Sequence, residues 1–268
     1  MAHPNRLQDA NVLIFGGTSG IGFAVASLVL SQGGHVTISG STQPKVNDKV
    51  AKLRSLYQSL PASNVSGHAV DLADTANLEK NLTDLFEKVT EGGQKKIDHI
   101  VFTAGDLSAP RGLADVTVEG VISGFNVRFI SSVFIAKLIR TGKYMPMSPS
   151  SSFTVTGGVN TRKPMPGWVL PAAWGGASSG LVNGLAVELA PIRINCVEPG
   201  AIHTELLDKA IQNMGPGALD AFAKATLTKT VGEPSDCAEA YAYFMRDRFV
   251  TGTTAQTNGG LLLAPRDS

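Results

Sequence analysis

Residues 13–22, LIFGGTSGIG, constrain the fold more than any other part of this 268-residue sequence. A short apolar run ends in a glycine-rich turn, and an apolar pattern with helical spacing follows. This order of strand, turn and helix is typical of a dinucleotide-binding unit, in which a pyrophosphate rests on the helix N-terminus. Gly16 permits the tight turn, Gly20 lets the backbone approach the pyrophosphate, and Gly22 lets the helix pack close to the strand. An ordinary glycine turn is the alternative, and the flanking patterns disfavour it.

Charge and composition exclude several classes of protein. The net charge is +1 and no basic cluster stands out, so we expect no nucleic-acid partner. Cys196 and Cys237 are far apart in the sequence, which favours buried thiols in a reducing compartment over a disulfide. The N-terminal residues are polar and no run approaches the roughly 20 apolar residues of a membrane span. We therefore expect a cytoplasmic protein with no membrane contact, and we assign no metal ligands.

Apolar, β-branched runs alternate with longer helical patterns along the whole chain. Short, nearly all-apolar strands between helices indicate a parallel sheet covered on both faces. We predict one α/β domain over residues 1–268, a doubly wound Rossmann-type fold with seven parallel strands. Its cofactor half would span about 11–156, and its substrate loop and lid about 157–230. The strand runs are 12–15, 35–39, 65–70, 99–103, 152–156, 192–197 and 254–257, and the helical patterns lie near 20–33, 46–60, 75–91, 116–143, 172–190, 204–229 and 235–247.

Residues 157–171, GGVNTRKPMPGWVLP, form a long segment rich in glycine and proline. They follow the fifth strand at its carboxyl end, where open α/β sheets bind ligands. A long loop in a compact domain is usually functional or disordered, and this position favours a functional loop.

The end of the second strand, HVTISGSTQPK, indicates which dinucleotide is bound. A carboxylate here would bind the ribose 2′-OH and repel a 2′-phosphate, but the segment contains neither Asp nor Glu. Gly40, Ser41 and Lys45 instead offer small donors and a positive charge, which points to NADP(H) over NAD(H). Alternatively, Lys45 is simply solvated. Asp71 would meet the adenine amino group, or else cap the following helix.

At this point the sequence resembles the short-chain dehydrogenase/reductase family over nearly its whole length. The matching pieces are residues 16–22, Asp71-Leu72, Thr103-Ala104-Gly105, RINCVEPG at 193–200, and Asn258-Gly259-Gly260. The resemblance implies that Pro199, Gly200 and Thr204 flank the nicotinamide, and that the protein is a dimer or tetramer. The full set of predicted cofactor contacts is Gly16, Thr18, Ser19, Gly20, Ile21, Gly22, Ser39, Gly40, Ser41, Lys45, Asp71, Leu72, Thr103, Ala104, Gly105, Pro199, Gly200, Ile202 and Thr204.

The catalytic residues of that family, Ser, Tyr, Lys and a helical Asn, are missing at the positions where spacing puts them. Counting back from LAVELAPIRIN, the Tyr, Lys and Ser positions are Pro171, Gly175 and Gly158. In the preceding helix Lys137 sets the register, and the Asn position is Arg128. Asn126 lies two residues before this Asn position, and on a helix an offset of two residues turns a side chain to a different face. A shifted alignment puts Trp174 and Ser178 at Tyr and Lys, and restores no acid. Tyr144 precedes the fifth strand instead of following it.

Loss of the proton donor disfavours carbonyl reduction, because losing a general acid typically costs 10²–10⁴-fold in rate. An iminium already carries a positive charge and gives a neutral amine, so its reduction needs no acid at the moment of hydride transfer. A narrower resemblance agrees with this. Residues 162–168, RKPMPGW, and Arg128 are similar to fungal secondary-metabolite members of the family, among them NADPH-dependent reductase/Diels–Alderases of prenylated indole alkaloids. Their loop has an acidic residue where Met165 stands here.

Three residues are the candidate catalytic set. Arg128 would orient a substrate carbonyl, or else lie on a helix surface. Trp168 would stack on an indole or prenyl group, or else fix the loop to the core. Met165 would form an apolar wall, or else be exposed. His203 titrates near neutrality but is also a plain helix-entry residue. Residues 204–229, with NMGP at 213–216, would form a mobile lid.

These observations favour an NADP(H)-dependent oxidoreductase of secondary metabolism. Its substrate would be a small molecule, a polycyclic indole alkaloid intermediate with a cyclic iminium, and it would also steer a Diels–Alder cyclisation by shape. A homo-oligomer is expected. Two other hypotheses stay open: a redox-silent cyclase or isomerase, and a non-catalytic NADP(H)-binding scaffold.

Overall fold

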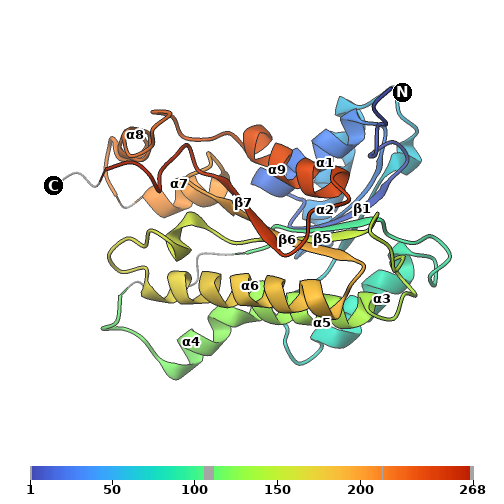
Figure 1. Ribbon diagram of the computed structural model, residues 1–268, viewed down its shortest axis with the longest axis horizontal. Coiled ribbons are helices and arrows are strands. Elements are labelled where there is room, and N and C mark those ends of the chain that lie inside the picture. The colour runs from blue at the N-terminus through green and yellow to red at the C-terminus, as the bar shows by residue number, and fades with distance from the viewer. Residues whose placement is uncertain (1, 106–111, 213, 266–268) are drawn as a thin grey trace.

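The computed structural model describes residues 2–105, 112–212 and 214–265, and within them seven strands form a single parallel sheet. The order across the sheet is β3-β2-β1-β4-β5-β6-β7. Figure 1 labels β7, β6, β5 and β1 of this sheet from left to right. The predicted fold is therefore confirmed, with strand ends that move by at most two residues. The strands are β1 (Asn11–Phe15), β2 (His35–Gly40), β3 (Val65–Ala69), β4 (His99–Phe102), β5 (Ser152–Thr156), β6 (Arg193–Pro199) and β7 (Thr253–Thr257).

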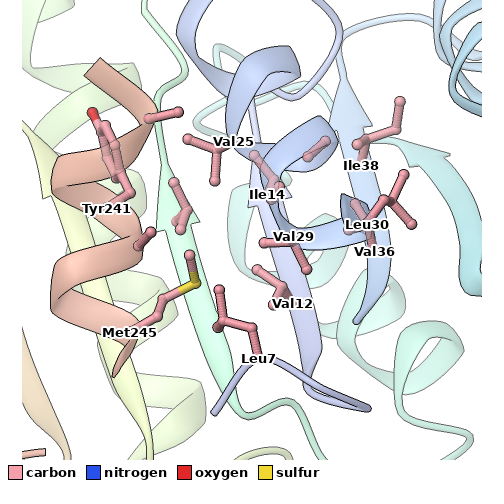
Figure 2. Packing of buried hydrophobic residues seen from close by; sticks show 14 of the residues in the cluster. Leu7, Val12, Ile14, Val25, Val29, Leu30, Val36, Ile38, Tyr241 and Met245 are labelled. Carbon is pink, nitrogen blue, oxygen red and sulfur yellow. The ribbon is translucent and has the colours of Figure 1, made fainter. Parts of the chain in front are cut away.

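Helices cover both faces of this sheet, because neighbouring residues of a strand point to opposite sides. In β1, Val12 and Ile14 pack with α1 (Gly20–Ser31) and α9 (Pro234–Arg246) (Figure 2). Helix α2 (Gln43–Leu56) adds Val46, Val50 and Leu53 to the same core. Leu13 and Phe15 pack on the other face with α3 (Leu78–Val89), α5 (Ser131–Ile139) and α6 (Val169–Glu188). The all-apolar strands thus serve two cores at once.

The strand order reverses between β1 and β4, which are adjacent in the sheet but not in the sequence. Ligands of doubly wound sheets bind at such a switch point, outside the carboxyl ends of the strands. Here those ends carry the glycine turn after β1 and Thr103-Ala104-Gly105 after β4. The fold therefore brings together two of the segments predicted to hold a cofactor.

Two of the predicted helices are interrupted. The pattern at 116–143 forms α4 (Val118–Phe125), a π-helical turn (Asn126–Ile130) and α5. The pattern at 204–229 forms two short helices, α7 (Glu205–Ile211) and α8 (Ala218–Lys224). Gly215 and Gly217 lie between these two helices with positive φ of 83° and 89°, a conformation that ends a right-handed helix. Asn213 lies outside the described residues.

The stretch Val118–Ile139 is long and apolar enough, by length and composition alone, to cross a membrane. This differs from the expectation that no run approaches that length. In the structure its α5 part buries Ser131, Ser132, Ile135, Ala136 and Ile139. A helix of a protein core passes the same test of length and composition, and α5 packs in this way against the sheet.

Candidate functional site

The glycine turn after β1 is shaped by close backbone contacts. Gly16 has a φ of +80°, and a Cβ there would lie 2.6 Å from the backbone nitrogen of Ala104. The N–H groups of Gly16 and Gly17 donate to the Ser39 carbonyl at 3.0 and 3.1 Å. A Cβ on Gly22 would overlap the Gly16 carbonyl and the Thr103 hydroxyl. The roles expected of Gly16 and Gly22 in turn geometry and helix packing agree with these distances.

The N-terminus of α1 has the features of an anion site. Ser19 is its N-cap and is extended, and no acidic residue lies in the first turn. The Ser19 hydroxyl makes no capping hydrogen bond within the described chain, so the first-turn N–H groups keep donors for a ligand. Gly20 has a φ of +47°, and a Cβ there would lie 2.9 Å from Thr204 Cγ2. The turn and the start of α7 therefore lie against each other, beside a surface hollow of about 370 Å³.

The charge at the end of β2 is compatible with a bound 2′-phosphate. Ser41 and Lys45 are exposed, and the first turn of α2 contains no acidic residue. The small Gly40 lies against Thr18, since a Cβ there would be 2.7 Å from Thr18 Cγ2. A phosphate at this edge would meet the α2 N-terminus and a cation together.

Several predicted cofactor contacts are buried side chains, so contact with a ligand would have to use their backbone. Ser39 is 1% exposed and holds the glycine turn through its carbonyl. Asp71 is exposed, and its Oδ1 accepts from the Ala73 N–H at 2.9 Å. The alternative that Asp71 caps the next helix is wrong, because α3 begins at Leu78 after Asn77. The other members with buried side chains are Thr18, Leu72, Pro199 and Ile202.

The segment after β6 lies against β7 and leads into α7. Gly200 N–H donates to the Thr257 carbonyl at 2.9 Å, and a Cβ on Gly200 would lie 2.9 Å from Asn258 Cα. Thr204 is the N-cap of α7, and its hydroxyl accepts from the Leu207 N–H at 3.2 Å. These contacts place Pro199-Gly200 and Thr204 at the carboxyl edge of the sheet, on the side of the glycine turn.

Arg128 lies in the π-helical turn and reaches the carboxyl ends of β4 and β5. Its Nη1 donates to the Thr156 carbonyl at 3.4 Å, and its guanidinium occupies the space that a Cβ on Gly105 would fill. Single π-turns inside helices are frequent at functional sites. The structure thus places a cation beside the predicted nicotinamide end of the cofactor site, where Arg128 as a catalytic residue stays a prediction.

The positions at which the family's Ser, Tyr and Lys were sought carry no acid in the structure. Gly158 precedes a short 3₁₀ turn (Val159–Thr161), Pro171 lies in the first turn of α6, and Gly175 lies one turn later. A Cβ on Gly175 would overlap the Thr161 hydroxyl. The loop therefore fills the space that a side chain at this position would need.

Trp168 and Met165 lie near the start of α6 and are both half-buried. Trp168 is the N-cap of α6, and its N–H donates to the Met165 carbonyl at 3.0 Å. The loop is thus three residues shorter than predicted, because α6 begins at Val169. Trp174 packs on Gly124 and meets the Phe125 ring edge-on, with centroids 6.2 Å apart. Met165 and Trp168 as catalytic residues stay predictions.

The sequence reasoning missed an ion pair at the end of β6. Glu198 is 1% exposed, and its Oε2 accepts from Arg162 Nε at 2.7 Å. Ser179 Oγ lies 3.5 Å from the other carboxylate oxygen. The hydrogen bond to Glu198 raises the pKa of Arg162. The signal was present in RINCVEPG, because a glutamate inside a buried strand requires a partner.

Neither of the two buried tyrosines of the described chain is placed to give a proton to a substrate. Tyr144 donates to Glu87 Oε1 at 2.6 Å and lies in the core. Tyr241, on α9, is fully buried and lies 2.6 Å from the Thr156 hydroxyl. Burial raises the pKa of both phenols, which makes them weaker acids.

His203 lines the hollow beside Gly20 and faces two carboxylates. Its ring nitrogens lie 3.5 Å from Asp208 and 3.7 Å from Glu233. Across residues 2–105, 112–212 and 214–265 there is no group of three or more His, Cys, Asp or Glu side chains suited to a metal ion. Cys196 and Cys237 are free and buried, and burial raises the pKa of each thiol to about 12.

Comparisons with known proteins agree with this geometry. A model of the SDR-like Rossmann domain matches residues 3–264. The short-chain dehydrogenase/reductase malC of Malbranchea aurantiaca is 42% identical over 257 residues, covering 96% of this chain and 96% of malC. The short-chain dehydrogenase/reductase ucsE of an Acremonium species is 36% identical, covering 97% of this chain and 98% of ucsE.

Solved structures of this family have the same fold. The MalC reductase/Diels-Alderase from Malbranchea aurantiaca superposes with a TM-score of 0.90 at 41% identity, over 97% of this chain and 100% of MalC. A short chain dehydrogenase from Burkholderia cenocepacia in complex with NADP superposes with a TM-score of 0.79 at 24% identity, over 96% of this chain and 99% of the other. At that level of identity the likeness concerns the fold.

Proposed function

Because the chain belongs to the family of SDR-like Rossmann domains, we propose that it is an NADP(H)-dependent reductase acting on a cyclic iminium. The observation that carries this proposal is the combination of a glycine turn suited to a dinucleotide with three described positions, those expected for the family's Ser, Tyr and Lys, that hold no acid. Gly158, Pro171 and Gly175 offer no proton, and Arg128 offers a fixed positive charge.

NADP(H) fits the residues at both ends of the predicted cofactor site. The α1 N-terminus has unused donors, and the exposed Lys45 and Ser41 follow β2 without a competing carboxylate. When bound, the cofactor supplies a hydride. The protein's own residues hold its phosphates, orient the substrate and exclude water from the site.

Arg128 would orient the substrate by donating a charge-assisted hydrogen bond to its amide carbonyl. Trp168 would offer a flat apolar surface to an indole ring, and Met165 an apolar wall. Because a cationic C=N becomes a neutral amine on reduction, no group has to supply a proton in that step. The substrate class we propose is a polycyclic indole alkaloid intermediate of secondary metabolism.

A Diels–Alder closure after reduction is the second activity in this proposal. MalC, with 42% identity, is a reductase/Diels-Alderase. A pericyclic closure requires only that diene and dienophile be held in a reactive geometry, which can lower the barrier by several kcal/mol. Met165 stands where similar fungal proteins have an acidic residue. The loop would therefore contribute to the cyclisation mainly through its shape.

The chain also presents a surface suited to a second copy. Helix α6 buries only Ser178 and Val182 among its described residues, and Gly176, Gly180 and Gly184 lie beside open space. These glycines recur every four residues and so share a face, where a second helix can approach closely. We propose a homo-oligomer assembled through this face, in the cytoplasm, where the two free cysteines stay reduced.

The test compares cofactors and substrates side by side. NADPH and NADH are titrated by fluorescence, and turnover is then measured with 2-methyl-1-pyrroline and with cyclohexanone. We expect tighter binding of NADPH and a kcat/KM for the imine at least 100-fold above that for the ketone, because solvent can protonate the imine to an iminium before hydride transfer, whereas the ketone needs an acid during that transfer. Product formation without cofactor would instead indicate a cyclase or isomerase, and cofactor binding without any turnover a scaffold.

Arg128→Ala should lower kcat/KM for the imine by about 10- to 100-fold, the loss expected for a hydrogen bond to a charged group. NADPH affinity should change by less than about threefold. Arg140→Ala, at the exposed end of α5, is the matched control and should leave both values unchanged. Equal rates in Arg128→Ala and wild type would contradict the proposed role.

A further inference from the structure

The carboxyl end of β6 carries a buried charge that the proposed reaction does not use. Glu198 points from the strand into the space between the 157–168 loop and α6, where Arg162 Nε donates to it at 2.7 Å. The Arg162 side chain is 48% exposed while that of Glu198 is 1% exposed. The carboxylate is thus part of the core, and the guanidinium covers it from the loop side.

The 157–168 loop contacts both β6 and α6 close to the Arg162–Glu198 pair. Gly157 starts it, and its N–H donates to the Val197 carbonyl at 2.8 Å. A Cβ on Gly157 would lie 3.1 Å from Glu198 Cγ, so a larger residue would crowd the glutamate. Four residues later, Thr161 lies against Gly175 of α6. The loop therefore contacts β6 through Glu198 and α6 through Thr161 within one short segment.

A second cation ties the loop to the end of the described chain. Lys163 Nζ donates to the carbonyls of Leu261 and Ala264 at 2.8 and 3.0 Å. Those bonds are to neutral acceptors, whereas the Arg162 bond is to a buried carboxylate, which leaves an uncompensated charge if it breaks. Loss of the Arg162–Glu198 bond should therefore cost the loop more than loss of a Lys163 bond.

We propose that the Arg162–Glu198 ion pair positions the 157–168 loop so that Met165 and Trp168 form one wall of the substrate site. Arg162 and Glu198 are positioning residues, and neither touches the reacting atoms. Thr161, one residue before Arg162, fills the space beside Gly175, where the family's Lys was sought. The kinetic part of this inference rests on the proposed function, whereas the part concerning the loop does not.

Limited proteolysis tests the position of the loop without any substrate. Trypsin can cleave after Arg162, whereas Lys163 precedes a proline and resists. In the full-length protein with NADPH present, Glu198→Gln should raise the rate of cleavage after Arg162 at least tenfold, well below the unfolding temperature. Glu239→Gln, which removes the exposed Arg246–Glu239 pair at 3.2 Å, is the matched control and should cleave at the wild-type rate. A rate within twofold of wild type in Glu198→Gln overturns the proposal.

The double variant Arg162→Gln/Glu198→Gln removes both charges and serves if Glu198→Gln fails to fold. Chymotrypsin cleavage after Trp168 then reports on the same loop, and we expect the same tenfold rise. Wild-type protection in the double variant also overturns the proposal, because an apolar fit alone would then hold the loop.

Turnover separates positioning from a merely structural role. With 2-methyl-1-pyrroline, Glu198→Gln should lose at least tenfold in kcat while its dissociation constant for NADPH stays within twofold. Arg162→Lys should retain more kcat than Arg162→Gln. Unchanged kcat in a variant whose loop is cleaved faster overturns the positioning role. If the wild type itself turns over no imine, the proposed function fails, and the proteolysis alone decides whether the pair holds the loop.

Discussion

Three glycines near the reacting end mark where neighbouring side chains have taken up space. A Cβ on Gly105 would overlap Arg128, one on Gly124 would overlap the Trp174 ring, and one on Gly175 would overlap Thr161. In each case the absent side chain lets a residue from another element come close to the backbone. The shape of the candidate site therefore depends on these glycines as well as on the side chains that pack against them.

Gly175 and Gly176 allow this interpretation to be tested with one methyl group. Within one copy Gly176 lies beside open space, so in the monomeric Gly180→Glu background Gly176→Ala should stabilise the helix by about 1 kcal/mol. Gly175→Ala should destabilise by about 1–3 kcal/mol, because the new Cβ meets Thr161. Thermal unfolding of both variants measures the difference. Thr161→Ser should leave the clash in place, whereas Thr161→Ala in the Gly175→Ala background should relieve it. Equal stability of the two single variants would contradict the overlap.

Arg128 shows how far spacing can predict a residue. Counting along the family pattern placed it at the catalytic helix, and the structure places its guanidinium at the ends of β4 and β5. The same count could not find the Arg162–Glu198 pair, since its members are 36 residues apart in sequence. A partner at that distance is fixed only when the loop folds back on the strand.

At the scale of elements, the π-helical turn between α4 and α5 is the clearest departure from the predicted pattern. The Ser131 hydroxyl donates to the Asn126 carbonyl at 3.2 Å across this turn. One inserted residue rotates everything that follows by about 100° relative to a continuous α-helix. A rule based on a uniform 3.6-residue period therefore cannot say which of Asn126 and Arg128 faces the site.

Helix α6 gives a prediction about assembly. If Gly180 lies in a contact between two copies, Gly180→Glu should convert the oligomer into monomers, because a buried charge and a side chain would separate the helices. Light scattering after size exclusion measures the mass. Ala51→Glu adds the same charge on an exposed position of α2 and should leave the mass unchanged. A monomeric wild type, or an oligomeric Gly180→Glu, would contradict assembly through this face.

At the scale of the whole molecule, the amino edge of the sheet, opposite the candidate site, holds a buried histidine whose protonation affects the free energy of unfolding. His99, at the start of β4, is 3% exposed, and its Nδ1 lies 2.9 Å from the Ser152 hydroxyl. Burial, with the charge of Arg193 next, lowers the pKa of His99 from 6.5 to about 3. The folded protein therefore keeps this ring neutral at pH values where the unfolded chain would protonate it.

This difference makes folding weaken as the pH falls. Above pH 6.5 both states are neutral and the full stability is present, whereas between 6.5 and about 3 only the unfolded state gains the proton. At pH 5 the loss should be about 2 kcal/mol, or several degrees in Tm. Thermal unfolding at pH 7.5 and 5 should show a smaller drop for His99→Gln than for the wild type. His3→Gln, at an exposed histidine, is the control, and an identical drop in all three would refute the assignment.

The sequence by itself determined the doubly wound sheet, the glycine turn and the absence of an acid at the expected catalytic positions. Each of these depends on local order: short apolar strands, helical periodicity, and glycines at fixed offsets from a strand. Tertiary structure alone decided where Arg128 points, that Glu198 is paired, and that a loop fills the space beside Gly175. Those outcomes depend on a π-turn and on contacts between distant segments, because burying a charge or a side chain requires a partner that local sequence does not specify.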